Sequence, residues 1–395
     1  MIRILGRVLG GTLSAALLAA SAYGWYEYRS LDKGLHRLHL SNLSVGDRAT
    51  PAGSAQNILI VGVDSRDGLS YQEQQRLLVG DAASLSADTI MVVHVPADGS
   101  RATMISIPRD SFVRIPGGFL KNKINAAYAD GFTYAPRRSS PDERRAAGAD
   151  TLVGAVRALT GLRIDHYVQV GFGGFYTIAK AIGGIHVNLC AATNDTYAVN
   201  VAHGLGRVGS GFKMTAGEHD LTPVQALEFV RQRHNLAGGD LAREKRQQYF
   251  ITAAFNKITS AGVLLNPGKL SALIKAVTGA FYVDDDGFSL LDLASQLADL
   301  GAGNISGYTV PIEGAGTRVV GGAELSVDVV RPERVRAFVR RVLAAPVSPV
   351  SPVSPASPGQ PASAVASSAP PPAAHQRSNP TVPTPTPSRP ANCIN

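Results

Sequence analysis

The chain has 395 residues, of which 45% are hydrophobic and 17% charged, with a formal net charge of +8 and a pI near 9.5. That hydrophobic fraction is ample for a folded core, and the positive charge favours anionic partners. The chain has no CxxC pair, Walker A loop or GxSxG elbow, and its basic residues form no run interleaved with aromatics. These absences argue against a zinc site, a P-loop, an activated serine and nucleic-acid binding.

The N-terminus carries a membrane signal. Arg3 and Arg7 precede an apolar stretch over residues 8–26, which is long enough to span a bilayer. The alternative is a cleaved signal peptide, because the Ala-Ser-Ala at residues 20–22 has the small side chains of a cleavage site. We predict an uncleaved transmembrane anchor within residues 1–30, with a cytoplasmic N-terminus. Both interpretations place the rest of the chain on the cell-wall side of the membrane.

Composition divides the remainder into three parts. Residues 31–55 are polar and mixed and are expected to form a stalk, and residues 56–344 are expected to form a single large domain. Pro, Ser and Ala dominate residues 345–395, which cannot bury enough apolar area to offset the entropy of ordering them. We therefore predict a disordered tail. Cys190 and Cys393 could pair in an oxidising compartment, but the position of Cys393 in this tail leaves the pairing open.

Strand and helix signals alternate along the domain, which predicts an α/β fold with an α+β-like mixed sheet flanked by helices. Apolar runs bounded by turn residues predict strands, and longer periodic segments bounded by Pro or Gly predict helices. The predicted strands are residues 57–63, 89–95, 102–107, 167–170, 185–189, 306–310 and 317–327. The predicted helices are residues 141–159, 175–182, 241–258, 268–278 and 288–300, with two more that open at Pro223 and Pro332.

Charged residues follow or precede the first three strands. An Asp-Gly turn predicts that the second and third strands form an antiparallel hairpin. If the first strand also runs antiparallel to the second, Asp64, Asp88 and Arg109 meet at one edge of the sheet. Mg²⁺ commonly takes one or two carboxylates together with phosphate oxygens, so Asp64 and Asp88 are candidate ligands for Mg²⁺ or Mn²⁺. The alternative is that each aspartate caps a turn or pairs with Arg66.

A dense group of charges lies at residues 231–248. On a helix, Asp240, Arg243 and Gln247 share one face, whereas Arg246 points elsewhere. We therefore predict that Arg246 is solvated or salt-bridged. A planar guanidinium binds phosphate with two parallel hydrogen bonds and keeps its charge, so the shared face is a candidate phosphate site.

Arg231 and Arg233 are two residues apart, which places them on nearly opposite sides of a helix. They share a face only in an extended chain. We therefore predict that the helix from Pro223 ends near Phe229 and that residues 231–233 are strand-like. The alternative for these arginines is a set of surface ion pairs with the acidic residues nearby.

Seven segments, taken together and in this order, resemble the LytR-CpsA-Psr family of cell-wall ligases. The resemblance covers roughly residues 56–260 and continues more faintly toward residue 343. The matching segments are NILIVGVDSR (57–66), SADTIMVVHV (86–95), SIPRDSFV (106–113), KINAAYADG (123–131), GGIHV (183–187), LTPVQALEFVRQR (221–233) and GDLAREKRQQ (239–248).

The resemblance implies a phosphotransferase that moves a glycopolymer from a polyprenyl-pyrophosphate carrier onto peptidoglycan and releases polyprenyl phosphate. It also implies that Asp64 and Asp88 hold Mg²⁺ near the pyrophosphate. The residues that it implies contact the pyrophosphate are Arg66, Arg109, Arg231, Arg233, Arg243 and Gln247. Asp240 is a further candidate on the same helix face, and Lys123 and Asn125 are candidates from a loop that could equally be only basic.

A lipid carrier also needs an apolar channel. Phe175, Ile178 and Ile182 and the segment at residues 270–277 are candidate walls, although each position could equally be core. The sequence departs from the family pattern in two places. A partly polar insertion at residues 71–84, which could form a helix beside the site, separates Asp64 from Asp88, and the Pro/Ser tail replaces the accessory domain of some actinobacterial relatives.

Two other functions stay open on the sequence alone. One is a non-catalytic scaffold or regulator that binds lipid-linked glycan, and the other is a pyrophosphatase that acts on the carrier lipid. The polymer is also open among arabinogalactan, teichoic or teichuronic acid and capsule. The expected partners are the lipid-linked glycopolymer, peptidoglycan and the membrane. The group that activates the acceptor is unassigned, with Asp110 as a candidate.

Overall fold

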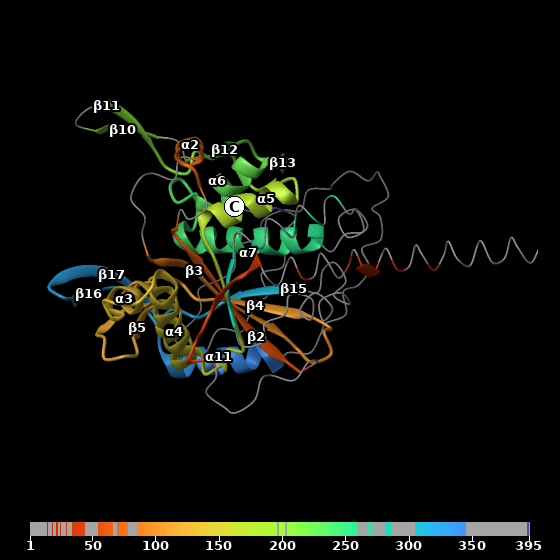
Figure 1. Cartoon of the computed structure of the whole chain (residues 1–395). Helices are drawn as coiled ribbons and strands as arrows, with labels where there is room; N and C mark the ends of the chain where they lie inside the picture. Colours follow the sequence, from red (N-terminus) through yellow and green to blue (C-terminus); the bar gives the residue numbers. More distant parts are fainter. Residues whose placement is uncertain are drawn as a thin grey trace, which may run out of the picture.

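The computed structural model describes residues 34–43, 54–65, 69–77, 85–195, 197–201, 204–258, 281–285, 305–344 and 393–394, together with isolated positions elsewhere. Within these residues, seven strands form a central mixed sheet in the order β1-β14-β7-β2-β3-β4-β15 (Figure 1). The strands are β1 (His36–Leu38), β2 (Gln56–Val63), β3 (Ala87–Val95), β4 (Ala102–Ser106), β7 (His166–Val170), β14 (Phe281–Asp284) and β15 (Ile305–Thr309). The predicted mixed α/β fold is confirmed.

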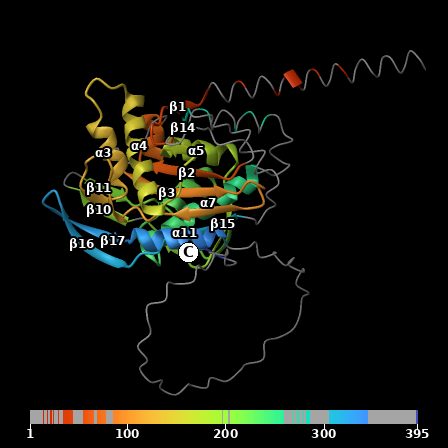
Figure 2. The ribbon, with the colours of Figure 1, turned by 90° about the horizontal axis from the view of Figure 1, so that it is seen from below.

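Helices cover both faces of this sheet. On one face the main core joins Leu59 and Ile105 of the sheet to Leu152 and Phe338 of the covering helices. On the other face Phe255 packs against β3 and β4. Figure 2 shows the strands in sequence from β1 and β14 at one side to β15 at the other. The first face carries α3 (Ala126–Tyr134), α4 (Pro141–Thr160) and α11 (Pro332–Ala344). The second face carries α7 (Gly239–Ile258), and α5 (Phe172–Ala181) and α6 (Pro223–Arg231) lie beside α7.

The register of β2 and β3 decides which side chains reach the edge of the sheet. The two strands are antiparallel, as the sequence argument assumed, and β3 also pairs antiparallel with β4, as predicted. Gly62 pairs with Thr89 but Val63 pairs with Ala87, so Asp88 is an extra residue that forms a β-bulge. A bulge bends its strand and re-aims a side chain. The N–H of Asp64 lies 3.5 Å from the carbonyl of Ser86, so both aspartates lie at this edge.

Capping boxes begin several of the described helices. Ser140 and Glu143 cap α4, whose first residue is Pro141, and Gly161 ends it in the left-handed conformation at φ 73°. Thr222 and its partner Gln225 cap α6 in the same way. A third box begins α2 (Tyr71–Arg76), so the start of the predicted insertion is helical, while residues 78–84 lie outside the described residues.

Several small sheets surround the central one. The predicted strand at residues 185–189 forms β8 (Ile185–Leu189), but it pairs with β13 and not with the central sheet. The predicted strand at 317–327 is instead a hairpin of two strands, because Gly321 and Gly322 both have positive φ and make a tight turn. The other small strands are β5 (Phe112–Arg114), β6 (Lys121–Lys123), β9 (Thr193–Asn194), β10 (Tyr197–Val201), β11 (Gly204–Val208), β12 (Lys213–Met214), β13 (Gly217–Leu221), β16 (Gly314–Val320) and β17 (Ala323–Val329).

The prediction that residues 31–55 form a stalk is wrong for residues 34–43. Strand β1 pairs parallel with β14 and so belongs to the central sheet. Leu38 and Leu40 are both 1% exposed, because this segment buries its leucines in the main core. The folded domain therefore begins before residue 36.

The structure leaves several predicted segments outside its description. The anchor predicted over residues 8–26 is described only at isolated positions, and none of the described helices is long and apolar enough to cross a membrane. The helix predicted over 268–278 is likewise described only at isolated positions, and the one over 288–300 lies outside the described residues.

The far C-terminus is attached to the domain. Cys393 forms a disulfide with Cys190, which answers the pairing that the sequence leaves open. Ile394 pairs in parallel alongside the end of β8, where it accepts a hydrogen bond from the N–H of Cys190 (3.0 Å) and donates one to the carbonyl of Asn188 (2.7 Å). The predicted tail lies outside the described residues from 345 to 392, and Ile394 near its end forms an isolated parallel β-bridge with Leu189.

We expect reduction of this disulfide to destabilise the domain. The two cysteines are 203 residues apart, and closing a loop of that length stabilises a protein by at most about 5 kcal/mol in the chain-entropy model. Urea unfolding with and without a reductant measures the difference, and Cys393→Ser should match the reduced protein. A Cys393→Ser variant as stable as the oxidised wild type would contradict the expectation.

Candidate functional site

Five charged side chains form a continuous chain of ion pairs at the edge of the central sheet, which we call the arginine–aspartate network. Arg109 is its centre, because its Nη1 lies 2.7 Å from Asp88 Oδ1 and its Nε lies 3.1 Å from Asp240 Oδ2. Arg233 Nη2 lies 2.6 Å from the other oxygen of Asp88. Arg243 Nε lies 2.9 Å from the other oxygen of Asp240. Positive and negative groups therefore alternate along the network.

Four parts of the fold supply these residues. Asp88 lies on the bulge of β3, and Arg109 follows the end of β4. Arg233 follows α6. Asp240 and Arg243 lie in the first turns of α7, three residues apart on one face, as predicted. The structure thus confirms that segments far apart in the sequence meet at one sheet edge.

Burial and neighbouring charges act together on the network. Burial lowers the pKa of Arg109, but the carboxylates of Asp88 and Asp240 outweigh this effect and raise that pKa overall. Burial also raises the pKa of Asp240, but Arg243 and Arg109 hold it below its usual value. Arg233, whose side chain is 46% exposed, has a lowered pKa because of burial and the nearby arginines. Three guanidinium groups and two carboxylates leave a net positive charge that favours an anion.

The turn that carries Arg233 is held from inside the protein. Gln232 is fully buried and ends α6 with an extended backbone at ψ 129°. Its Oε1 accepts a 2.6 Å hydrogen bond from Arg246. The buried carboxylate of Asp195 accepts hydrogen bonds from the backbone N–H groups of Arg233 and His234, each at 3.3 Å. The turn is therefore fixed by side chains that the network does not use.

The prediction that Arg246 is solvated or salt-bridged is wrong. Its side chain is 1% exposed and lies over the rings of Phe229 (4.5 Å) and Phe212 (5.5 Å). Burial lowers its pKa to about 10. The helical pattern correctly predicts that Arg246 and Asp240 lie on different faces of α7. The face that carries Arg246, however, packs against α6 and does not face solvent.

The prediction that α6 ends near Phe229 and that residues 231–233 are strand-like is wrong for Arg231 but correct for the extended backbone of Gln232. The helix continues through Arg231. Arg231 Nη1 donates to the carbonyl of Leu77 at 3.0 Å, where it satisfies the C-terminal end of α2, and its guanidinium lies 4.9 Å from the ring of Phe172. Arg231 thus contacts α2 and α5, and Arg233 joins the network.

The basic loop contributes through its backbone and one ion pair. Lys123 Nζ lies 2.9 Å from Asp110 Oδ1. The N–H of Asn125 donates to the carbonyl of Arg109 (3.1 Å), and the carbonyl of Asn125 accepts from the N–H of Ala87 (3.2 Å). Asn125 therefore ties Arg109 to the residue before Asp88.

Two other predicted contacts are not shown. Gln247 lies on α7 and, among the described residues, makes no hydrogen bond to the network. Its neighbour Gln248 is buried and donates to Ser106 Oγ at 2.7 Å, which fixes α7 against β4. Arg66 lies outside the described residues.

The candidate lipid-contacting residues belong to one apolar cluster. The rings of Phe175 and Phe250 are 4.0 Å apart, and Ile182 is buried beside them. Leu273, from the predicted segment at residues 270–277, joins the same cluster. Ile178 is partly buried on the same helix, α5. This packing fits a core, and the role of these residues in lipid binding stays a prediction.

The sequence reasoning did not predict two acidic residues near the network as site residues, of which Glu244 is buried and Asp328 is partly buried. Glu244 is 5% exposed, its Oε2 has no hydrogen-bond partner in the described part of the chain, and burial together with Asp240 raises its pKa to about 8. Asp328 of β17 donates its N–H to the carbonyl of Asp110 at 2.8 Å. The spacing of four residues from Asp240 could have indicated Glu244. No signal in the sequence could have placed Asp328 here.

The donor set at the sheet edge fits a hard divalent cation. Asp64 and Asp88 lie there together, and carboxylate oxygens are the ligands that Mg²⁺ prefers. Among the described residues, no three Asp, Glu, His or Cys side chains are arranged to hold a metal. A metal at these two aspartates would therefore complete its shell with water and phosphate oxygens, as Mg²⁺ usually does.

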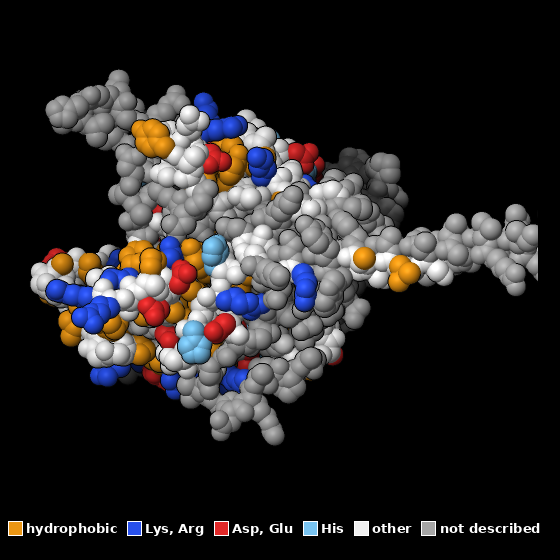
Figure 3. Space-filling model, viewed as in Figure 1, with side chains coloured by type: hydrophobic (Ala, Val, Ile, Leu, Met, Phe, Trp, Pro, Cys, Tyr) orange, Lys and Arg blue, Asp and Glu red, His pale blue; other side chains and the backbone are white. Residues whose placement is uncertain are grey.

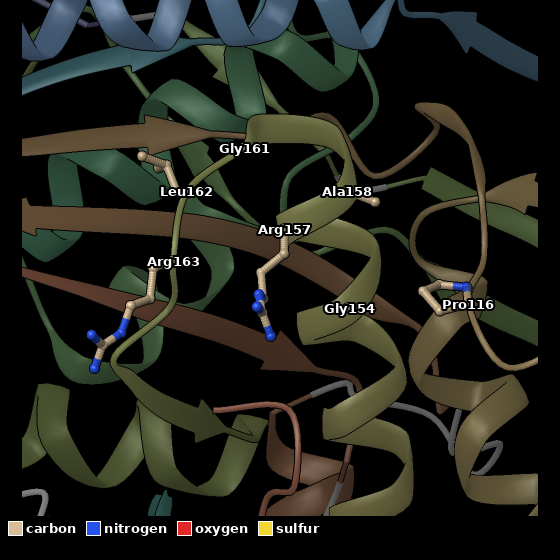
Figure 4. Close-up of a pocket in the computed structure, with 7 residues that line it drawn as sticks. All are labelled: Pro116, Gly154, Arg157, Ala158, Gly161, Leu162 and Arg163. Atoms are coloured by element: carbon tan, nitrogen blue, oxygen red, sulfur yellow. The ribbon is translucent and has the colours of Figure 1, made fainter. Parts of the chain in front are cut away.

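A pocket lies at the other end of β2, away from the network. Its volume is about 530 Å³, and Figure 4 shows Arg157 and Arg163 among its lining residues, at the C-terminal end of α4. Arg163 forms an ion pair with Asp165, next to the first residues of β2. This pocket is not part of the site that the network forms.

Fold and network together define a class of protein, in which an α/β domain with a mixed sheet carries an arginine-rich anion site at one sheet edge. The chain belongs to the LytR_cpsA_psr family, whose model matches residues 36–335.

Relatives agree with this assignment. The chain is 38% identical over 311 residues to the cell wall biosynthesis protein LcpA of Corynebacterium glutamicum, which covers 74% of this chain and 56% of the relative. It is 30% identical over 270 residues to TagU of Oceanobacillus iheyensis, named a polyisoprenyl-teichoic acid–peptidoglycan teichoic acid transferase, with coverage of 66% and 72%. The chain thus spans just over half the length of the corynebacterial relatives LcpA and LcpB.

Solved structures show the same fold. B. subtilis TagV superposes with a TM-score of 0.51 at 21% sequence identity, covering 74% of this chain and 98% of TagV. TagT bound to LI-WTA superposes with a TM-score of 0.52 at 18% identity, covering 78% and 98%.

We expect the wild-type protein to lose stability as the pH rises, and the Glu244→Gln substitution to remove this loss. The folded pKa of about 8 exceeds the ordinary value of 4.5, so the ionised form is disfavoured in the folded state. Wild-type stability should therefore fall as pH rises from about 5 to 8, by on the order of 4 kcal/mol relative to Glu244→Gln. Guanidinium unfolding at pH 5 and pH 8 measures this, with exposed Glu324→Gln on β17 as the control. Equal pH dependence in wild type and Glu244→Gln would contradict the assignment.

Proposed function

We propose that this protein is a phosphotransferase that attaches a glycopolymer to peptidoglycan, taking it from a polyprenyl-pyrophosphate carrier and releasing polyprenyl phosphate. The observation that carries the proposal is the arginine–aspartate network, in which three guanidinium groups converge on one partly exposed sheet edge. Family membership and the activities for which its relatives are named support a role in cell-wall polymer attachment.

The network suits a diphosphate. Arg233 and Asp240 are its more exposed members, so phosphate oxygens can approach from their side and compete with the carboxylates for guanidinium N–H groups. Phosphoryl transfer needs positioning and charge neutralisation more than a covalent nucleophile. Arg109 would hold the anion from the centre, with Arg233 and Arg243 on either side.

A divalent metal has a place in this proposal. Asp64 and Asp88 would hold Mg²⁺ or Mn²⁺, which would neutralise charge on the pyrophosphate oxygens when bound. Asn125 supports the arrangement, because its backbone fixes both Arg109 and the residue preceding Asp88.

The lipid part of the donor and the cellular location belong to the same proposal. The apolar cluster that contains Phe175 and Ile182 would lie along the carrier tail, and each buried methylene contributes roughly 0.8 kcal/mol to binding. The predicted anchor would hold the domain at the outer face of the membrane. The disulfide between Cys190 and Cys393 supports an oxidising compartment.

A single assay separates the proposed activity from its alternatives. The full chain is incubated with a labelled polyprenyl-pyrophosphate glycopolymer, peptidoglycan and Mg²⁺. Label that becomes covalently attached to peptidoglycan, with equal release of polyprenyl phosphate, supports the transferase. Release of free polymer indicates a pyrophosphatase, and a donor that binds but is not consumed indicates a scaffold; either result overturns the proposal.

We expect Arg109→Lys to lower the rate of transfer by about 10²- to 10³-fold, the usual loss for one preorganised hydrogen-bond donor. Lysine keeps the charge, but its single ammonium cannot bond Asp88 and Asp240 from two separate nitrogens as Arg109 does. Initial rates of label transfer measure the effect, with Arg340→Lys on the exposed face of α11 as the matched control. Equal rates for Arg109→Lys and wild type would show that the network is not the reacting site.

We expect a chelator to abolish transfer and added Mg²⁺ or Mn²⁺ to restore it. Asp88→Asn should weaken this restoration, because an amide is a poorer ligand than a carboxylate for a hard cation. A thermal-shift titration with Mg²⁺ and inorganic pyrophosphate gives a second readout that does not depend on turnover. Transfer that continues at full rate in excess chelator would remove the metal from the proposal.

A further inference from the structure

We propose that Asp328 takes the proton from the attacking hydroxyl group of the acceptor, and that the β17 side of the network is therefore the acceptor side. This inference rests on the proposed function and adds to it the general base that the transfer requires. It also assigns a role to a residue about eighty positions beyond the last residue of the network.

The backbone places Asp328 beside the network. Its N–H donates to the carbonyl of Asp110 at 2.8 Å, and Asp328 forms a parallel β-bridge with Ser111. Asp110 directly follows Arg109, the centre of the network. Because these are main-chain contacts, they fix the backbone of Asp328 beside Asp110 independently of the conformation of its side chain.

The carboxylates near Arg109 differ in their partners. Both oxygens of Asp88 and both oxygens of Asp240 accept hydrogen bonds from arginines. Asp110 forms an ion pair with Lys123 at 2.9 Å. Within the described part of the chain, Asp328 forms no ion pair. A general base needs a carboxylate whose lone pairs are available, and Asp328 meets that condition best among these residues.

The surroundings of Asp328 favour proton uptake. Burial raises its pKa, the nearby Asp110 and Asp240 raise it further, and Lys123 opposes them. From α7, Glu244 also faces it and is close enough for Asp328 to raise the pKa of Glu244. The Oε2 of Glu244 is buried without a hydrogen-bond partner in the described residues. The raised pKa values of Asp328 and Glu244 therefore favour the binding of a proton by this group of carboxyls.

The two sides of the network suit different substrates. In Figure 1, β16 and β17 lie apart from α2, α5 and α6, with α7 and the ends of β3 and β4 between them. The α5 and α6 side holds the apolar cluster. On the β16–β17 side, Figure 3 shows Lys and Arg side chains over α3, β16 and β17 together with hydrophobic ones, and Val319 of β16 is 68% exposed. Arg114, Lys121 and Arg318 are exposed on these strands and on the neighbouring β5 and β6, which suits an acceptor that carries carboxylates, as peptidoglycan does.

In the proposed step, one bond to phosphorus forms and one breaks, and Asp328 carries the proton. The acceptor hydroxyl gives its proton to the Asp328 carboxylate as its oxygen bonds to the phosphorus that carries the glycan. The bond from that phosphorus to the bridging oxygen breaks, and the electron pair leaves with polyprenyl phosphate. Asp328 then returns the proton to solvent.

The test compares Asp328→Asn and Asp328→Ala with wild type, and uses Glu324→Ala on the same strand as the matched control. General-base catalysis typically contributes 10²- to 10⁴-fold, so both Asp328 variants should lose about that factor in the rate of transfer. Binding of the lipid-linked donor, measured without acceptor, should stay unchanged. Added formate should restore part of the rate to Asp328→Ala only, because a small carboxylate can enter the space left by the side chain.

Failure of this inference is distinguishable from failure of the proposed function. Wild-type protein that attaches no label to peptidoglycan removes both. Wild-type transfer that Asp328→Asn and Asp328→Ala match overturns the inference alone. An equal loss of donor binding and of transfer, with no rescue by formate, also overturns it, because that pattern shows a structural role.

Discussion

The bridging position of Arg109 is the constraint on which the site depends. One guanidinium bonds two carboxylates that are far apart in the sequence, Asp88 on a strand and Asp240 on a helix. Unpaired arginines are costly to bury, so the carboxylates keep the guanidinium groups charged and in place before any substrate is present. In the proposed function, the resting network would be preorganised for an anion, which would compete with the carboxylates for the guanidinium N–H groups.

Local irregularities of the backbone, more than regular elements, aim these side chains. A bulge in β3 turns Asp88 toward the edge of the sheet. The extended backbone of Gln232 turns the chain after α6, so that the side chains of Arg231 and Arg233 point in different directions. Arg246 and Asp195 hold that second turn from within the protein. A substitution at these buried positions would act on the site through geometry, although none of them contacts the network's carboxylates in the structure.

The sequence predicts the regular parts of this fold well, because they follow from local rules. Hydrophobic runs locate β2, β3 and β4, the Asp-Gly turn sets their direction, and Pro and Gly mark the ends of α4. The meeting of Asp64, Asp88 and Arg109 at one edge then follows from topology. Local rules fail where a long-range contact decides the outcome. Burial of Arg246 depends on Phe212 and Phe229, and the sheet position of β1 depends on a partner almost 250 residues away. Asp328 reaches the site through a single backbone bridge.

The distribution of charge around Arg109 gives the site a direction. Toward α6 the network ends in an exposed arginine next to an apolar cluster, and toward β17 it ends in a group of carboxyls. In the proposed function, a lipid-linked diphosphate would place its oxygens among the arginines with its tail along the apolar side. The phosphorus that carries the glycan would then face the carboxyls, and the acceptor hydroxyl would attack from that side, in line with the leaving group. The asymmetry of the surroundings, more than any one residue, would therefore set which side receives the donor and which the acceptor.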